Sequence, residues 1–322
     1  MWYIKEINNI DEMLEESQKE LPKILKKVIY LYKYITNKGR IIQLENGYIY
    51  NIPLILKNKK IKTKKVEKIC ENIFKKYNPK NVAISNELEK NDQFKNCLYS
   101  KNIHILNGRN LFNILVIDIL KYIAEKQRNK LENMEITVLV NDTTDFNIEN
   151  IKLISQNVKM LSIVTNNINK LKTIQSKLCE EYGILVKLSN NTKKSLGRAK
   201  IIVNLDFAEN TLNKYNIYNR SIILNVNGDA TIYKKSFNGI VIQNFEPVLP
   251  LKYITIFKDY NVFNYFNRTI LCESMIIMKD TFTNIRKKIE RENIDVYRLS
   301  GSNGYISDEE FEKYRFKIEM SQ

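Results

Sequence analysis

The residues of this chain best suited to contact a ligand are short polar side chains that follow apolar segments. Asn, Asp and Thr offer both hydrogen-bond donors and acceptors. In open parallel sheets, ligands bind beyond the carboxyl ends of the strands, where the strand order reverses. Seven such residues follow the apolar runs 136–140, 160–164 and 222–224, and we predict that they border a ligand-binding groove between residues 1–126 and the domain that follows. They are Asn141, Asp142, Thr143, Thr144, Asn166, Asn225 and Asn227.

Catalytic and metal-binding residues are not evident in the sequence. The four cysteines, Cys70, Cys97, Cys179 and Cys272, are far apart and form no CxxC pair, so we expect neither a disulfide framework nor a Cys/His zinc site. Cys70, Cys179 and Cys272 occupy apolar helix positions and are predicted to be small buried core residues. The single histidine, His104, lies between two isoleucines and is interpreted as a strand residue. No catalytic residue, metal site or cofactor is therefore predicted.

Six short apolar segments between residues 135 and 243 have the character of strands covered on both faces. Helices are expected between them at 148–157 and at 168–182, where Gly183 supplies the stop signal. This βαβαβ order predicts an α/β fold, with a Rossmann-like doubly wound parallel sheet over 127–250. The predicted strands are 136–140, 160–164, 184–186, 201–203, 222–224 and 240–242.

The preceding part of the chain predicts a separate N-terminal mixed α/β domain, residues 1–126. An amphipathic helix spans 10–34, either kinked at Pro22 or divided there into two helices. Alternating strands around Asn46-Gly47 predict a tight hairpin. Helices at 64–77 and 92–99, strands at 81–85 and 103–106, and an apolar helix at 110–130 complete the domain and lead into the next.

The last segment, 251–322, is expected to be helical. One long helix over 261–290 carries an apolar stripe and is predicted to close the fold by packing back on the N-terminal domain, near 110–130. Residues 300–304 form a turn. Ser307 and Glu310 then have the spacing of a capping box that begins a short terminal helix.

This order of elements resembles the shikimate dehydrogenase-like two-domain oxidoreductases, a layout shared by glutamyl-tRNA reductase and the methylene-tetrahydrofolate dehydrogenases. The short crossover Ser195-Leu196-Gly197-Arg198-Ala199-Lys200 leads to the segment that corresponds to their fourth strand. The resemblance implies an NAD(P) cofactor, with Asn204-Leu205-Asp206 in the loop that borders it.

The first strand-to-helix turn departs from that pattern. A dinucleotide site uses glycines there, so that the backbone can approach the pyrophosphate. The turn here, residues 141–146, contains no glycine and carries Asp142 and Asp145, whose charges repel phosphate. Asn166, after the second strand, offers no charge to a ribose. We therefore expect a degenerate, non-catalytic relative that binds a ligand or a protein partner and uses no cofactor. An oxidoreductase with an atypical loop is the alternative.

The formal net charge of +16 gives a second alternative, binding of nucleic acid. The lysines of the chain are spread through every segment, with the densest run at 57–65. Because the positive charge is mostly not concentrated, binding of nucleic acid is not favoured. No apolar run approaches the roughly 20 residues needed to span a bilayer, and the first residues lack the order of a signal peptide. We expect a cytoplasmic protein without membrane contact, and a homodimer is left open.

Overall fold

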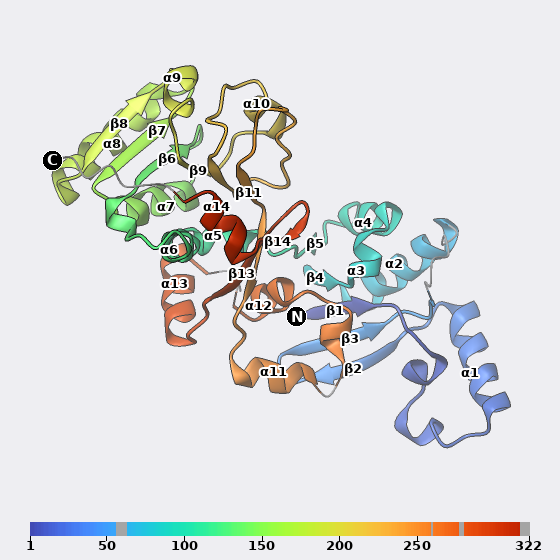
Figure 1. The fold of residues 1–322 in the computed structure, drawn as a ribbon. Coiled ribbons are helices and arrows are strands. Elements are labelled where there is room, and N and C mark those ends of the chain that lie inside the picture. Colours follow the sequence, from blue (N-terminus) through green and yellow to red (C-terminus); the bar gives the residue numbers. More distant parts are fainter. Residues whose placement is uncertain (56–62, 259, 277–279, 316–322) are drawn as a thin grey trace. The chain divides into compact units, whose positions relative to one another are not determined.

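The computed structural model describes residues 1–55, 63–258, 260–276 and 280–315 (Figure 1). The chain divides into two compact units, each assembled from two segments. The first unit contains Met1–Gly108 and Leu249–Met278, and the second contains Arg109–Val248 and Lys279–Gln322. Most of the lysine-rich run, residues 57–62, lies outside the described residues.

The first unit is built on a mixed five-stranded sheet, as expected for an N-terminal mixed α/β domain. Its order is β2-β3-β1-β4-β5, and all neighbours except β2 and β3 are parallel. The predicted hairpin is confirmed, with Leu44 opposite Gly47. The first strand was not predicted, because it is short and opens the chain. The strands are β1 (Trp2–Lys5), β2 (Arg40–Leu44), β3 (Gly47–Asn51), β4 (Asn81–Ile84) and β5 (His104–Ile105).

Apolar helix faces cover this sheet. Val66, Ile69 and Ile73 of α2 pack with Phe94 and Leu98 of α4 in one buried cluster against the strands. The helices of the first unit are α1 (Lys23–Thr36), α2 (Thr63–Tyr77), α3 (Asn86–Glu89), α4 (Asp92–Tyr99), α11 (Leu251–Lys258) and α12 (Arg268–Ile276), with 3-10 turns η1 (Ile10–Met13), η2 (Glu16–Gln18) and η4 (Val262–Asn264).

The helix expected over 10–34 is divided, as one of the two readings of Pro22 predicted. Pro22 is the N-cap residue of α1, and the C-cap residue, Asn37, adopts the left-handed conformation. The part before Pro22 is not a second α-helix but two 3-10 turns. Each turn is held by its own side chains: Asn9 caps η1 and Glu15 forms a capping box with Gln18. Local capping bonds thus replaced the longer helix that the apolar spacing suggested.

The second unit contains the predicted doubly wound sheet. Its order is β11-β10-β9-β6-β7-β8 and every pair is parallel, so strand order reverses between β6 and β9. Most interior positions are branched aliphatic residues, which suits strands covered on both faces; Thr137 and Ser162 are buried polar exceptions. The strands are β6 (Glu135–Leu139), β7 (Met160–Val164), β8 (Leu185–Ser189), β9 (Ile201–Asn204), β10 (Ile222–Asn225) and β11 (Ile240–Ile242).

A small antiparallel sheet, β12-β13-β14, completes the second unit. The turn predicted at 300–304 joins two of its strands, and the capping box of Ser307 and Glu310 begins the last helix as predicted. The remaining elements are α5 (Arg109–Ile114), α6 (Val116–Lys126), η3 (Leu131–Asn133), α7 (Asp145–Ser155), α8 (Ile168–Tyr182), α9 (Thr192–Leu196), α10 (Glu209–Leu212), α13 (Phe282–Arg291), α14 (Asp308–Lys313), β12 (Asn244–Pro247), β13 (Val296–Gly301) and β14 (Gly304–Tyr305).

The prediction of one long helix over 261–290 is wrong. The segment contains α12 in the first unit and α13 in the second, each started by its own cap: Asn267 accepts from the amide of Ile270, and Thr281 from that of Asn284. The apolar spacing alone predicted one continuous helix, but these caps divide the segment into two. Within the described residues, no helix combines the length and apolarity required to cross a membrane.

Candidate functional site

The loop between β6 and α7 lies at the point where strand order reverses in the second unit. Its backbone amides already have an acceptor: both carboxylate oxygens of Asp206, in the loop after β9, accept from the amide of Asn141 at 2.8 and 2.9 Å, and one accepts from that of Asp142 at 2.8 Å. Asn147 donates to the same carboxylate at 3.3 Å. The protein's own carboxylate therefore binds the first strand-to-helix turn, where dinucleotide-binding proteins hold a pyrophosphate.

Burial of Asp206 raises the pKa of its carboxyl group, and the hydrogen bonds from the amides of Asp142 and Asn141 oppose that rise. The nearby charge of Asp142 adds to the increase. The carboxylate is thus held by amide dipoles rather than by a cation, an arrangement that resembles anion binding at a helix N-terminus.

Four of the seven predicted ligand-binding residues build this loop. Asn141 accepts from the amide of Asn166, a fifth member of the set, at 2.9 Å. Thr144 is the N-cap of α7 and accepts from the amide of Asn147 at 3.2 Å. Asp142 and Thr143 are exposed. The structure therefore brings Asn141 and Asn166 together and gives Thr144 a structural role.

The other two predicted residues lie at the carboxyl end of β10: Asn225 is its last residue and Asn227 follows it. Asn225 is fully buried; it accepts from Asn204 at 2.6 Å and donates to the carbonyl of Gly228 at 2.6 Å. Asn227 is exposed and donates to the carbonyl of Phe207 at 3.4 Å. These bonds fix the loops after β9 and β10, so the side chain of Asn225 is occupied by the fold.

A pocket of about 460 Å³ lies within the first unit, beyond the carboxyl ends of β1 and β3. Polar groups dominate its lining, with three basic and three acidic side chains, so its formal charge is balanced. The charged residues are Lys5, Lys19, Arg40, Asp11, Glu12 and Glu16, and the polar ones include Asn51 and Tyr265. Concave sites with a few convergent polar groups are the usual places for small ligands.

Lys5 and Glu12 form an ion pair in the lining of this pocket. Lys5, at the end of β1, is almost fully buried, and its Nζ is 2.5 Å from Oε2 of Glu12 and 3.6 Å from the centre of the Tyr265 ring. Burial lowers the pKa of Lys5, while the hydrogen bond and charge of Glu12 counteract this effect. The hydroxyl of Tyr265 donates to both oxygens of Glu12 at 2.9 Å, and burial together with these bonds raises the pKa of Tyr265.

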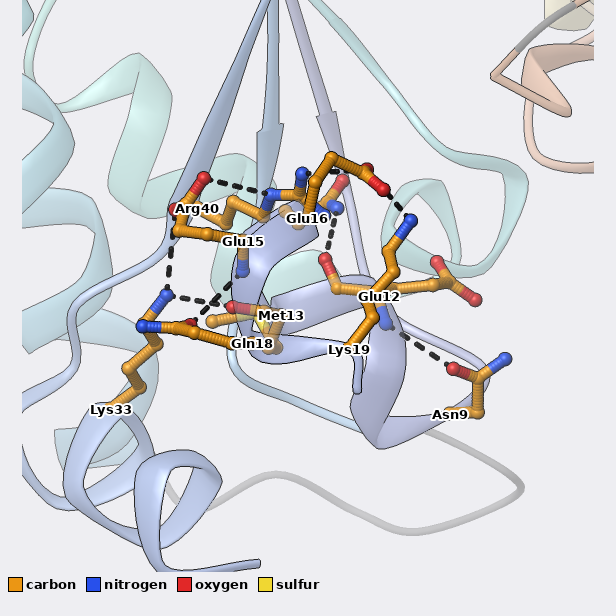
Figure 2. A network of polar contacts seen from close by, with 10 residues as sticks. Asn9, Glu12, Met13, Glu15, Glu16, Gln18, Lys19, Lys33 and Arg40 are labelled. Carbon is orange, nitrogen blue, oxygen red and sulfur yellow. Dashed lines mark hydrogen bonds and ion pairs between the residues drawn. The ribbon is translucent and has the colours of Figure 1, made fainter. Parts of the chain in front are cut away.

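Two further groups of the pocket have hydrogen-bonding capacity left over. Asn51, buried at the end of β3, donates to the carbonyl of Glu12 at 2.9 Å, but its Oδ1 has no hydrogen-bond partner among the described residues. The same is true of Nε of Arg40, whose nearest carboxylate oxygen, on Glu15, is 3.6 Å away. Figure 2 shows Arg40 beside Glu15 and Glu16.

Arg40 and Asn51 are direct partners in the β2-β3 ladder. Opposite residues of an antiparallel pair carry their side chains on the same face, about 5 Å apart at Cβ. Arg40 and Asn51 therefore point to the same face of the sheet and both residues line the pocket, while Nε of Arg40 and Oδ1 of Asn51 are themselves buried.

Sequence reasoning did not find this pocket. Lys5 and Glu12 are ordinary charged residues at the ends of short elements, and Tyr265 is more than 250 positions away along the chain. The one available signal was a lysine that directly follows the apolar residues Trp2-Tyr3-Ile4.

The four cysteines and the histidine do not line the pocket of the first unit. Cys70 and Cys272 are buried as predicted, Cys179 is half-buried, and none of the four cysteines forms a disulfide. Burial raises the pKa of the Cys70 thiol. His104 belongs to β5 and is exposed. In the described parts of the chain, no three Cys, His, Asp or Glu side chains are grouped in a way that could hold a metal ion.

No protein-family model and no curated protein sequence matches this chain. Among solved structures it is similar to the dipicolinate synthase A chain from Bacillus subtilis, with 9% identity and a TM-score of 0.34 over 59% of this chain and 64% of that one. It is also similar to L-tryptophan dehydrogenase from Nostoc punctiforme, with 12% identity and a TM-score of 0.30 over 90% and 87% of the two chains.

A third similar structure is the anabolic ornithine carbamoyltransferase from Campylobacter jejuni, with 8% identity and a TM-score of 0.26 over 91% of this chain and 88% of that one. All three similarities are distant, with identities of 12% or less and TM-scores of 0.34 or less. The matched region is less than two thirds of the dipicolinate synthase chain.

Proposed function

We propose that this protein is a non-catalytic Rossmann-like binding protein that uses no dinucleotide. The observation that carries the proposal is the carboxylate of Asp206 on the amides of Asn141 and Asp142. A pyrophosphate would have to displace this carboxylate and then lie beside the negative charges of Asp142 and Asp145. No glycine in the loop helps the backbone to approach it.

The ligand is proposed to bind in the pocket of the first unit instead. A ligand carboxylate would pair with the guanidinium of Arg40 in place of Glu15 and Glu16, and a donor on the adjacent carbon would turn Asn51 toward the ligand and satisfy its Oδ1. Small α-amino acids and 2-hydroxy acids have this combination, and their near-neutral or singly charged state suits a pocket with balanced charges. In the empty pocket, Nε of Arg40 and Oδ1 of Asn51 are buried without hydrogen-bond partners among the described residues, which costs free energy. A ligand that supplies these partners would recover that free energy on binding.

The absence of dinucleotide binding is tested by thermal shift with NAD and NADP. We expect no rise in melting temperature at about 1 mM, which corresponds to a binding free energy weaker than about 4 kcal/mol. The variant Asp206→Asn, which weakens the internal acceptor, serves as a comparison. A clear rise for the wild-type protein at lower concentration would restore the oxidoreductase.

Ligand binding in the first unit is tested with a panel of α-amino acids and 2-hydroxy acids, read by thermal shift and calorimetry. We expect at least one member to bind, and Arg40→Gln to weaken it about tenfold or more because a charge-assisted bond is lost. Arg128→Gln, which removes an exposed arginine of the second unit, is the matched control. The pocket is excluded as the site if Arg40→Gln and Arg128→Gln bind the ligand equally.

A further inference from the structure

Helix α1 is amphipathic, but it presents its apolar side to solvent. Ile24, Val28, Leu31 and Ile35 have the spacing of one helix face. With Leu25 and Tyr32 they form what we call the α1 stripe, whose members are between 48% (Leu25) and 76% (Ile24) exposed. The helix contains no buried residue at all.

The opposite side of α1 faces the protein and carries lysines. Nζ of Lys26 is 3.3 Å from Oδ1 of Asp11, and Lys33 donates to the carbonyl of Met13 at 2.7 Å and lies 3.9 Å from Glu15. Figure 2 shows Lys33 reaching toward Met13, at the end of η1, and Glu15, the N-cap of η2. Ile29 and Tyr30 are half-buried on this side, so packing within the fold accounts for them but not for the α1 stripe. Partly exposed ion pairs of this kind contribute little to stability.

Other helices of similar length behave in the ordinary way. In α2 the apolar residues Val66, Ile69 and Ile73 are buried against the sheet, and in α8 Leu171 and Leu178 are buried. The α1 stripe is therefore a particular feature of this helix. Contiguous exposed apolar patches mark sites of association with a protein or a membrane.

The charges around the α1 stripe indicate what kind of surface binds it. Helix α1 has four lysines and no acidic residue, and Lys23 and Lys27 are exposed beside the stripe. Lys38 lies over the ring of Tyr32 at 5.6 Å, and Lys65 of α2 over that of Tyr34 at 3.5 Å. Cations thus accompany the apolar surface, in a protein whose net charge is +16.

A second copy would bring the same cations against this rim, whereas an anionic lipid surface complements both features. Basic helices with Leu and Ile on one face lie in the plane of a bilayer with the apolar face in the headgroup region. Tyrosines suit that boundary, because one end of the side chain is apolar and the other polar. We propose that α1 docks this protein on the surface of membranes that contain anionic lipids.

The test is co-sedimentation of the full chain with vesicles. We expect the protein to bind vesicles of phosphatidylglycerol and phosphatidylcholine at least about tenfold better than vesicles of phosphatidylcholine alone, and raised salt to weaken the binding. The double variant Ile24→Gln/Leu31→Gln should lose most of the binding, since it removes apolar surface. Its control is Leu185→Gln, at an exposed leucine of the second unit.

The electrostatic part is tested with Lys23→Gln/Lys27→Gln, which should weaken binding about tenfold, against Lys172→Gln/Lys177→Gln on α8. All four lysines are exposed, so these variants should keep the fold. The proposal is overturned if the wild-type protein ignores anionic vesicles, or if the stripe variant binds them as well as the wild type. It is also overturned if light scattering shows a dimer that the stripe variant dissociates without any change in vesicle binding.

Discussion

Two regions of this protein lie beyond the carboxyl ends of parallel strands, yet they treat polar groups in opposite ways. In the second unit, Asp206 supplies the acceptor that the amides of the β6-α7 loop require. In the first unit, Lys5 and Glu12 satisfy one another, while Arg40 and Asn51 retain a donor and an acceptor without a hydrogen-bond partner among the described residues. The β6-α7 loop of the second unit is therefore complete without a ligand, whereas the pocket of the first unit has hydrogen-bonding capacity left for a further molecule.

The contrast shows that the strand topology indicates where a ligand site could lie, but the side chains there decide whether it can bind one. The reversal of strand order is the usual place for a ligand in a doubly wound sheet. One aspartate is sufficient to occupy the amides that a phosphate would use. A mixed sheet like that of the first unit is not a usual place for a ligand, but here it borders the pocket that contains the ion pair of Lys5 and Glu12.

The largest effect is expected for Glu12→Gln. This change leaves the nearly buried cation of Lys5 without its counter-charge, which should lower the free energy of unfolding by about 3 kcal/mol. Urea denaturation measures the change. Lys5→Met/Glu12→Gln should recover more than half of the loss, because the unpaired charge is gone; a double variant less stable than Glu12→Gln would show that the pair is not the central interaction of the pocket.

A smaller loss, about 2 kcal/mol, is expected for Asp206→Ala. The amides of Asn141 and Asp142 would lose their acceptor in a partly buried loop. Denaturation of Asp142→Asn provides the control, since the carboxylate of Asp142 is exposed and 4.0 Å from its nearest cation, on Lys170. Equal stability of Asp206→Ala and the wild type would mean that water replaces the carboxylate without loss, and the loop would no longer count as internally complete.

A still smaller effect, about 1 kcal/mol, is expected for Thr144→Ala, which removes the N-cap of α7. Thermal denaturation against Thr143→Ala, an exposed neighbour in the same loop, isolates the capping bond. If both variants were equally stable, Thr144 would be free of its structural role and available to a ligand, as the sequence analysis proposed.

The smallest effect concerns pH. Burial lowers the pKa of Lys5 in the folded protein below its usual value of 10.5. The unfolded chain therefore holds the proton more tightly, and the free energy of unfolding should rise with pH through the folded pKa and level off near 10.5. Urea denaturation of the wild type and Lys5→Met across the alkaline range measures the difference; a gap that moves in favour of Lys5→Met as pH rises would contradict this account of Lys5.

The sequence by itself determined the elements whose signals are local. The six strands of the parallel sheet followed from short branched apolar runs, the hairpin from Asn46-Gly47, and the last helix from the capping box of Ser307 and Glu310. It also showed that the β6-α7 loop lacks the glycines of a dinucleotide site. Each of these signals lies within a few residues, where propensity and hydrogen bonding act directly.

Only the tertiary structure decided which polar groups meet. Asp206 reaches the amide of Asn141 across 65 positions, and Tyr265 reaches Glu12 across 253. The periodicity that predicted one helix over 261–290 could not reveal that Asn267 and Thr281 start separate helices in different units. The apolar spacing of α1 was equally visible in the sequence, but burial depends on what packs against a helix, and here its lysines face the protein.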